Sequence, residues 1–185
     1  EIRPQSPYAK SKLDAERAIQ RLAEDHRLRF LIFRCATVFG ASPWMRFHTA
    51  VNKFCWQAVH GVPITVWKTA LDQTRPYLDL NDVVRAIVFA VERQMFPNEI
   101  YNLVTTNTTV SDILNTIRTS VPDLAVRSTE AQVMNPLSFR VSAEKFKERG
   151  FRFQGDLNRA IQETIALITT QYPAHRPFSE IAAAA

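Results

Sequence analysis

Ser6-Pro7-Tyr8-Ala9-Lys10-Ser11-Lys12 opens the stretch of sequence from which the fold can be read. Apolar residues recur after it at helical spacing as far as about Asp25, which predicts an amphipathic helix that begins near Pro7. In such a helix Tyr8 and Lys12 project from one face, one turn apart. A lysine ammonium beside a phenol favours the phenolate and lowers a pKa that is ordinarily about 10. The pair is therefore a candidate proton-transfer group, against the alternative of two side chains on a solvated helix face.

A continuous apolar run, Phe30 to Phe33, follows this helix and leads into Arg34-Cys35-Ala36-Thr37-Val38-Phe39-Gly40. Continuous apolarity is typical of a strand buried on both faces, as in a parallel sheet. Glu99 to Val104 has the same character and predicts a second buried strand. A helix followed by such a strand is half of a doubly wound unit, so the sequence predicts an α/β fold.

Together these stretches resemble the extended short-chain dehydrogenases/reductases, the family of NAD-dependent sugar-nucleotide epimerases and dehydratases. There a Tyr-x-x-x-Lys helix precedes a strand that ends in Arg-Pro-x-Asn-Val-Tyr-Gly, and Arg34 to Gly40 follows that order with Cys35, Thr37 and Phe39 in place of Pro, Asn and Tyr. The resemblance implies that Tyr8 and Lys12 are catalytic and bind NAD or NADP. It also implies that Cys35 contacts the cofactor and that Thr37 donates a hydrogen bond to a nucleotide sugar.

Two further landmarks extend the resemblance. Asp72 to Ala86 resembles the family's Gly-Asp-Gly-x-Gln-x-Arg-Asp-Tyr-Val-x-Val-x-Asp-Val-Ala-x-Ala, although the Gly-Asp-Gly turn is missing. The resemblance gives Arg75 the role of binding the nucleotide-sugar diphosphate, which a planar guanidinium can grip through paired oxygens; a surface ion pair is the alternative. Phe139 to Phe151 resembles the closing signature, in which a strand delivers a residue to the ligand. Arg140 is either that residue or a solvated side chain.

The remaining elements follow from periodicity, caps and turn residues. We expect helices over His48 to His60, from a cap at Asn81 or Asp82 to about Arg93, from a cap at Ser111 to about Arg118, and from a cap at Asp156 to about Ile168. Short strands are expected at 64–67 and 124–127, and a polar turn at 105–109. The helix that ends near Arg93 is expected to bury Val83, Val84, Ile87, Val88 and Val91. For Asp82 a structural role, as a helix cap, outweighs a catalytic one.

The predicted fold is the C-terminal part of a doubly wound parallel-sheet, Rossmann-like domain with a smaller mixed α/β substrate-binding domain. Residues 1–40 and 78–105 would belong to the first, residues 41–77 and 106–175 to the second, and residues 176–185 would form a tail. The four glycines do not form the Gly-x-x-Gly-x-x-Gly turn that seats a dinucleotide. Because that turn belongs upstream of Tyr8, and because the chain opens on Glu1, we expect one portion of a longer enzyme, inactive by itself.

Composition limits the classes of partner. The 185 residues include 23 basic and 18 acidic side chains, a net charge of +5 that suits an anionic ligand. There is no basic run interleaved with aromatic residues, so nucleic-acid binding is not expected. No apolar run has membrane-spanning length and no metal-ligand cluster stands out. Cys35 and Cys55 lie in apolar contexts, which predicts reduced core thiols in a cytoplasmic protein.

The resemblance implies an NAD(P)-dependent sugar-nucleotide epimerase, homodimeric at full length. Tyr8 would take a proton from a sugar hydroxyl while the adjacent carbon passes hydride to the nicotinamide. A sugar-nucleotide 4,6-dehydratase or a keto-sugar reductase of the same family is the enzymatic alternative. A truncated, catalytically silent module is the other alternative.

Overall fold

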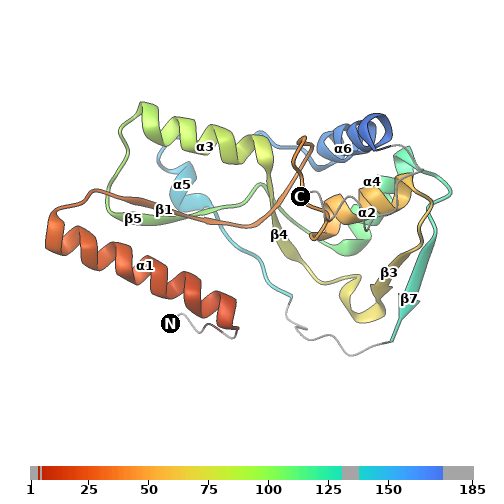
Figure 1. Ribbon diagram of the computed structural model, residues 1–185, viewed down its shortest axis with the longest axis horizontal. Helices are drawn as coiled ribbons and strands as arrows, with labels where there is room; N and C mark the ends of the chain where they lie inside the picture. The colour runs from red at the N-terminus through yellow and green to blue at the C-terminus, as the bar shows by residue number, and fades with distance from the viewer. Residues whose placement is uncertain (1–3, 5, 131–137, 173–185) are drawn as a thin grey trace.

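The computed structural model describes residues 4, 6–130 and 138–172. Two regions follow one another along the long axis in Figure 1. One, the strand-pair region, is a pair of strands flanked by helices α1 (Pro7–His26) and α3 (Leu80–Glu92). The other, the helical region, gathers helices α2 (Ala50–Val59), α4 (Val110–Ser120) and α6 (Leu157–Gln171) beside strands β3 (Ile64–Trp67) and β7 (Val126–Thr129). The predicted tail, residues 176–185, lies outside the described residues.

Helix α1 (Pro7–His26) begins where the sequence predicts. Ser6 is its N-cap, and the Ser6 hydroxyl accepts a hydrogen bond from the Ala9 backbone N–H at 3.1 Å. Arg27 ends the helix in the left-handed region, with φ of 53°. No residue of α1 is buried. The predicted helix is confirmed, and its apolar side is only partly covered by the described residues.

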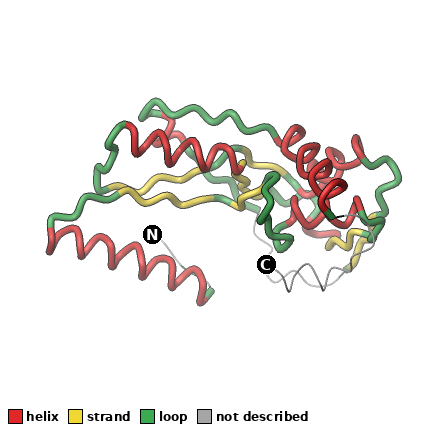
Figure 2. Tube along the Cα trace, turned by 45° about the horizontal axis from the view of Figure 1, so that its top comes forward, coloured by secondary structure: helices red, strands yellow, loops and turns green. Residues whose placement is uncertain are grey.

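Strand β1 (Leu31–Cys35) pairs in parallel with β5 (Glu99–Leu103), with Leu31 opposite Glu99 and Cys35 opposite Leu103. Figures 1 and 2 both show α1 along one side of this pair and α3 along the other. The parallel pairing with flanking helices confirms the α/β prediction.

The expected burial of β1 on both faces is wrong. Its first four residues are half-buried and Cys35 is exposed, because β5 is its only partner strand in the described part of the chain. The prediction of two core thiols is therefore wrong for Cys35. It is confirmed for Cys55, which is buried and free.

Strands β2 (Thr37–Phe39), β4 (Arg75–Asp79) and β6 (Thr106–Thr108) form a second sheet with β4 in the middle. Strand β2 pairs with β4 in parallel and β6 pairs with it antiparallel. The polar turn expected at 105–109 is thus a strand for most of its length. Its β-branched threonines suit a strand, and the backbone of β4 supplies the hydrogen-bond partners.

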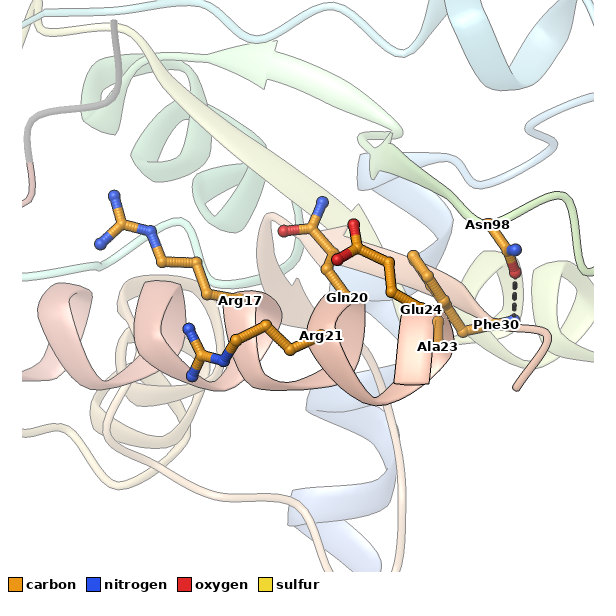
Figure 3. A pocket seen from close by; sticks show the side chains of 7 residues that line it. All are labelled: Arg17, Gln20, Arg21, Ala23, Glu24, Phe30 and Asn98. Atoms are coloured by element: carbon orange, nitrogen blue, oxygen red, sulfur yellow. Dashed lines mark hydrogen bonds between the residues drawn. The ribbon is translucent and has the colours of Figure 1, made fainter. Parts of the chain in front are cut away.

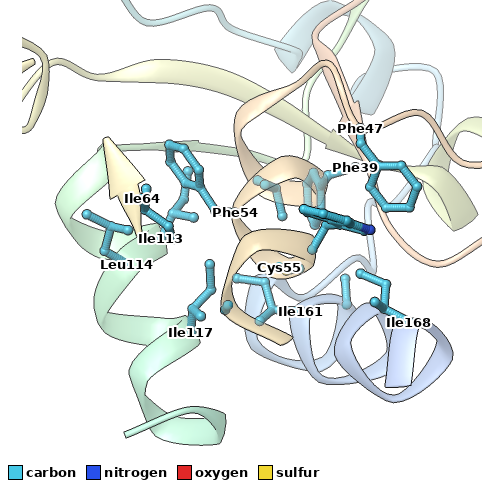
Figure 4. Close-up of a cluster of buried hydrophobic side chains, with 14 of the residues drawn as sticks. Phe39, Phe47, Phe54, Cys55, Ile64, Ile113, Leu114, Ile117, Ile161 and Ile168 are labelled. Carbon is cyan, nitrogen blue, oxygen red and sulfur yellow. The ribbon is translucent and has the colours of Figure 1, made fainter. Parts of the chain in front are cut away.

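Helices α2 (Ala50–Val59), α4 (Val110–Ser120) and α6 (Leu157–Gln171) pack together beside β3 (Ile64–Trp67), which pairs in parallel with β7 (Val126–Thr129). A short 3-10 helix (Lys68–Ala70) follows β3. Figure 4 shows the apolar side chains that these helices turn toward one another. Six predicted inward positions are confirmed: Val51, Phe54, Cys55, Ile113, Leu114 and Ile117. This region contains the larger of the two apolar clusters of the described residues.

Two of the predicted helix caps are wrong. Helix α3 (Leu80–Glu92) is capped by Asp79, whose Oδ1 accepts from the Asn81 N–H at 2.8 Å, rather than by Asn81 or Asp82. Helix α4 is capped by Thr109, which forms a capping box with Asp112, rather than by Ser111. The cap of α6 at Asp156 is confirmed.

The apolar face of α3 is only partly the predicted one. Val84, Ile87, Val88 and Val91 are exposed, between 46% and 59%, whereas Ala86 and Ala90 are buried. The two alanines are small enough to let the helix backbone approach the sheet closely, and a burial prediction based on side-chain size passes over them. Four large apolar side chains consequently lie on the outer face of α3.

The segment from Ser138 to Ala143 is not the expected strand, although it is held like one. The Phe139 N–H donates to the Thr74 carbonyl at 3.1 Å. The Asn107 side chain accepts from the Val141 N–H at 2.9 Å and donates to the Val141 carbonyl at 3.1 Å. Helix α5 (Glu144–Lys147) follows, and Gly150, at φ of 91°, turns the chain as predicted.

Within the described ranges no helix is long and apolar enough to span a bilayer.

Candidate functional site

Tyr8 and Lys12 lie on the same side of the first two turns of α1. The Lys12 Nζ is 5.4 Å from the centroid of the Tyr8 ring, within the range of a cation–π contact. Tyr8 is 71% exposed, so a ligand can reach its hydroxyl. The helix begins at Pro7, which places both side chains near its N-terminal end.

An ion pair joins α1 to β1. The Arg34 guanidinium donates from Nε to Glu16 Oε1 at 2.8 Å and from Nη2 to Glu16 Oε2 at 2.5 Å. The hydrogen bonds to Glu16 raise the pKa of Arg34 above its ordinary value. From the sequence, Arg34 is only a landmark of the family resemblance, and Glu16 is not singled out. The available signal was the spacing of Tyr8, Lys12 and Glu16, each four residues from the next.

Thr37 and Arg75 lie on neighbouring strands. In the register of β2 with β4, Thr37 is opposite Tyr77, two residues after Arg75. Thr37 is exposed and Arg75 is half-buried. Cys35, two residues before Thr37, has the pKa of its thiol raised by partial desolvation, which favours the neutral thiol.

Arg75 is oriented by two neighbours. Its Nη2 donates to Gln73 Oε1 at 3.1 Å, and its Cζ lies 5.0 Å from the centroid of the Phe139 ring. Phe139 was not singled out from the sequence, which pointed instead to Arg140, the next residue. Nothing local distinguishes these two positions, because Phe139 reaches Arg75 only through the contact of its segment with Thr74.

Arg140 is exposed and lines a cavity of about 340 Å³ with Thr105, Asn107, Ser142 and Lys147 among its walls. Arg75 is not among the residues that line this cavity. The structure therefore brings together Tyr8 with Lys12, and Thr37 with Arg75 on paired strands. It places Arg140 at a cavity of its own.

Asp82 is fully buried and joins three parts of the chain. Its carboxylate accepts hydrogen bonds from the Thr105 hydroxyl at 2.7 Å, from the backbone N–H groups of Gln154 and Gly155, each at 2.9 Å, and from Arg85 at 3.0 Å. A Cβ at Gly155 would lie 2.4 Å from the Cβ of Asp79, so only glycine fits there. The cap expected at Asp82 is wrong, because Asp79 caps α3 and the Asp82 carboxylate is instead a buried hydrogen-bond acceptor.

No group of three or more His, Cys, Asp or Glu side chains within the described ranges could hold a metal ion. Burial raises the pKa of Asp79, the neighbour of Asp82, because its carboxylate is partly desolvated. Asp79 and Asp82 both lie where α3 packs against the 154–156 segment, since Asp82 accepts hydrogen bonds from Gln154 and Gly155 and Asp79 lies against Gly155.

The chain belongs to the NAD dependent epimerase/dehydratase family, whose model matches residues 1–103. That stretch holds α1, β1, β2, β4 and β5, and hence Tyr8, Lys12, Thr37 and Arg75. The resemblance to sugar-nucleotide epimerases and dehydratases is thereby confirmed.

Two curated relatives are similar to parts of this chain. The chloroplastic UDP-sulfoquinovose synthase of Spinacia oleracea is 34% identical over 101 residues, which cover 54% of this chain and 20% of that protein. The dTDP-D-glucose 4,6-dehydratase of Bos taurus is 27% identical over 173 residues, which cover 88% of this chain and 47% of that protein. The chain thus spans less than half the length of these relatives.

Solved structures of the family have the same fold. The UDP-glucuronic acid 4-epimerase of Bacillus cereus, solved with UDP-glucuronic acid and NAD, superposes with a TM-score of 0.82 at 20% identity. The match covers 93% of this chain and 55% of that one. The Rossmann-like fold class is therefore confirmed over nearly the whole chain.

Proposed function

We propose that this chain carries the proton-transfer pair and part of the nucleotide-sugar site of an NAD(P)-dependent sugar-nucleotide epimerase. One observation carries the proposal: the Lys12 ammonium is 5.4 Å from the ring of an accessible Tyr8. A nearby cation stabilises an ionised phenol, and an ionised phenol is a base. Membership of an NAD-dependent family supplies the context.

The cofactor chemistry assigned to this chain is limited to the nicotinamide side. When bound, NAD or NADP supplies the hydride acceptor and donor for the sugar carbon. The Lys12 ammonium, with three donor hydrogens, fits the ribose hydroxyls of such a group. Cys35, as an exposed neutral thiol at the end of β1, would line the same side. None of the four glycines of the chain is placed to form a pyrophosphate-binding turn.

Tyr8 would accept the proton of a sugar hydroxyl and return it in the reverse step. Lys12 would keep its positive charge beside the Tyr8 ring during the transfer. Both side chains project from the start of a helix whose N-terminal N–H groups add positive potential at that end. The protein's part in the chemistry is thus to hold and move one proton beside a carbon that changes oxidation state.

Arg75 would anchor the diphosphate of the nucleotide sugar. Its guanidinium lies against the Phe139 ring and is held by Gln73, which restricts its conformations before a ligand arrives. Thr37, on the paired strand, would donate a hydrogen bond to the substrate. Arg140 is a second candidate for a phosphate or sugar oxygen. In the full-length enzyme we expect a homodimer.

The decisive experiment is Tyr8→Phe in the full-length protein, assayed with a panel of UDP- and dTDP-hexoses. Loss of the acid–base hydroxyl should lower kcat by about 100-fold or more, while the dissociation constant for UDP stays within about twofold. Tyr172→Phe is the matched control, since the Tyr172 hydroxyl donates to the Pro43 carbonyl at 3.2 Å and serves no proposed catalytic step. Unchanged turnover in Tyr8→Phe would remove Tyr8 from the mechanism.

A 4,6-dehydratase is the second candidate, because the bovine dehydratase matches 88% of this chain. Product analysis separates the two: a dehydratase releases a 4-keto-6-deoxy sugar nucleotide, whereas an epimerase interconverts two sugars of equal mass. A keto-sugar reductase would consume reduced cofactor. A catalytically silent module would bind UDP and turn over none of the panel.

A further inference from the structure

Helix α1 makes a single kind of polar contact with the rest of the described chain. Its residues form hydrogen bonds or ion pairs within the helix and its cap, and among the described residues the pair between Glu16 and Arg34 alone reaches outside. Helix α1 buries no residue completely. The position of this helix against β1 therefore depends unusually strongly on one ion pair.

Glu16 occupies an inward position on the helix. The half-buried residues of α1 are Ala9, Leu13, Glu16, Ala18, Ile19 and Ala23. Glu16 is the one charged residue among them, and its side chain is only 14% exposed. Burying an unpaired carboxylate on this face would cost free energy of folding. The Arg34 guanidinium compensates by donating two parallel hydrogen bonds to Glu16.

A hollow lies beside the C-terminal half of α1. A cavity of about 560 Å³ lies between that half of the helix and the segments that carry Phe30 and Asn98. Figure 3 shows Arg17, Gln20, Arg21 and Glu24 extending from the helix around this space. Side-chain packing at this end is therefore incomplete, and the ion pair adds a directional restraint on the rotation of the helix.

We propose that Glu16 and Arg34 are positioning residues that set the rotation of α1 and so aim Tyr8 and Lys12 toward the end of β1. The inference rests on the function proposed above. Glu16 lies one turn from Lys12 and two turns from Tyr8 on the same helix. Fixing the direction in which Glu16 points from the helix axis therefore also fixes the directions of Lys12 and Tyr8. Arg34 is three residues before Thr37, and β1 pairs along its whole length with β5. The pair thus links the proton-transfer helix to the end of β1, from which the chain continues into β2 and Thr37.

The test uses Arg34→Lys and Glu16→Gln in the full-length protein. Lysine keeps the charge of Arg34 and loses its fork, and glutamine keeps the shape of Glu16 and loses its charge. The exchanged pair Glu16→Arg with Arg34→Glu restores opposite charges at the same two positions. Asp14→Asn is the matched control, because Asp14 pairs with Arg17 at 3.8 Å on the exposed face of the same helix.

Amide hydrogen exchange across residues 9–20 gives a readout that needs no turnover. We expect exchange to accelerate about tenfold in both single variants, which corresponds to the worth of a charge-assisted hydrogen bond. Asp14→Asn should leave the rates unchanged, and the exchanged pair should recover part of the protection. Unchanged exchange in Arg34→Lys and Glu16→Gln would overturn the proposal, whatever the activity.

Kinetics then test the link to catalysis. In both single variants we expect kcat to fall about tenfold while KM stays within twofold, because Tyr8 is no longer correctly oriented and the substrate contacts of β2 and β4 remain. In the exchanged pair we expect kcat to recover. A rise in KM with constant kcat would overturn the positioning role. If the parent protein turns over no substrate, the proposed function fails, and hydrogen exchange still decides whether the pair holds α1.

Discussion

The helices of the helical region bury their apolar residues more completely than the helices of the strand-pair region do. Helix α2 buries six of its ten residues, including Val51 and Cys55, both with no exposed surface. Helix α1 buries none of its 20 residues, and α3 leaves Ile87 half exposed. All three helices are amphipathic in sequence. The difference shows that amphipathic periodicity is enough to form a helix and does not determine how completely its apolar side is covered.

Ile161→Ala against Ile87→Ala should give the largest contrast. Ile161 in α6 is fully buried, so truncation leaves a cavity and should lower the free energy of unfolding by about 2–5 kcal/mol. Ile87 in α3 is 50% exposed, and its truncation should cost less than about 0.5 kcal/mol. Urea denaturation of both variants measures the difference. Equal losses would mean that the outer face of α3 is covered in solution and would break the comparison.

Asp82→Asn tests the buried contact between the two regions. The amide cannot accept all the hydrogen bonds that reach Asp82 from Thr105, Gln154 and Gly155, and we expect a loss of about 2 kcal/mol in unfolding free energy. The exposed Asp123→Asn serves as the control and should change it by less than about 0.5 kcal/mol. A negligible loss in Asp82→Asn would show that the 154–156 segment is held by packing alone.

Acidification should act on the strand-pair region through Glu99. The Lys145 ammonium and the Tyr101 hydroxyl hold the pKa of this carboxyl down at about 2, with a further contribution from Arg149. A depressed pKa stabilises the fold above the ordinary value of about 4.5, and this contribution is lost as the pH falls toward 2. Urea midpoints are measured between pH 6 and pH 2. The midpoints of the parent and of Glu99→Gln should differ at pH 6 and converge near pH 2.

Glu148→Gln is the control for this titration, because the described structure gives the Glu148 side chain no ion pair. Its urea midpoint should follow that of the parent at every pH. If the midpoints of Glu99→Gln and the parent stay equally far apart at pH 2, the ion pairs of Glu99 are not the source of the acid sensitivity.

Val88→Lys should have the smallest effect on stability and a clear effect on assembly. Val88 lies among the four exposed apolar residues of α3, so the change in unfolding free energy should stay within about 0.5 kcal/mol. We expect the 185-residue chain alone to self-associate at micromolar concentration through such exposed faces. Sedimentation velocity should show less association in Val88→Lys than in the parent. A monodisperse parent chain that unfolds cooperatively would contradict the expectation.

Local features explain what could be predicted. The helix from Pro7 and the cap at Asp156 depend on residues within four positions of one another, and both predictions are confirmed. The family could be recognised because its landmarks occur in order along the chain. The prediction of the α4 cap was wrong although it too depends on neighbouring residues. Thr109 and Ser111 are both good capping residues, and the capping box with Asp112 favours Thr109.

Contacts between distant residues explain what could not be predicted. Phe139 reaches Arg75 across 64 positions of sequence, and Arg34 reaches Glu16 across 18. The burial of Ala86 and Ala90 in place of Val84 and Val91 depends on how closely α3 approaches its sheet. The exposure of Cys35 follows from the single partner strand that the described structure gives β1.

The sequence by itself determined the α/β class, the family and the placing of Tyr8 and Lys12 one turn apart, since each depends on spacing along the chain. The tertiary structure decided which faces are covered, which carboxylate is buried, and which partner orients Arg34 and Arg75. Burial and pairing depend on close packing between segments far apart in sequence, and periodicity records only that a face is apolar.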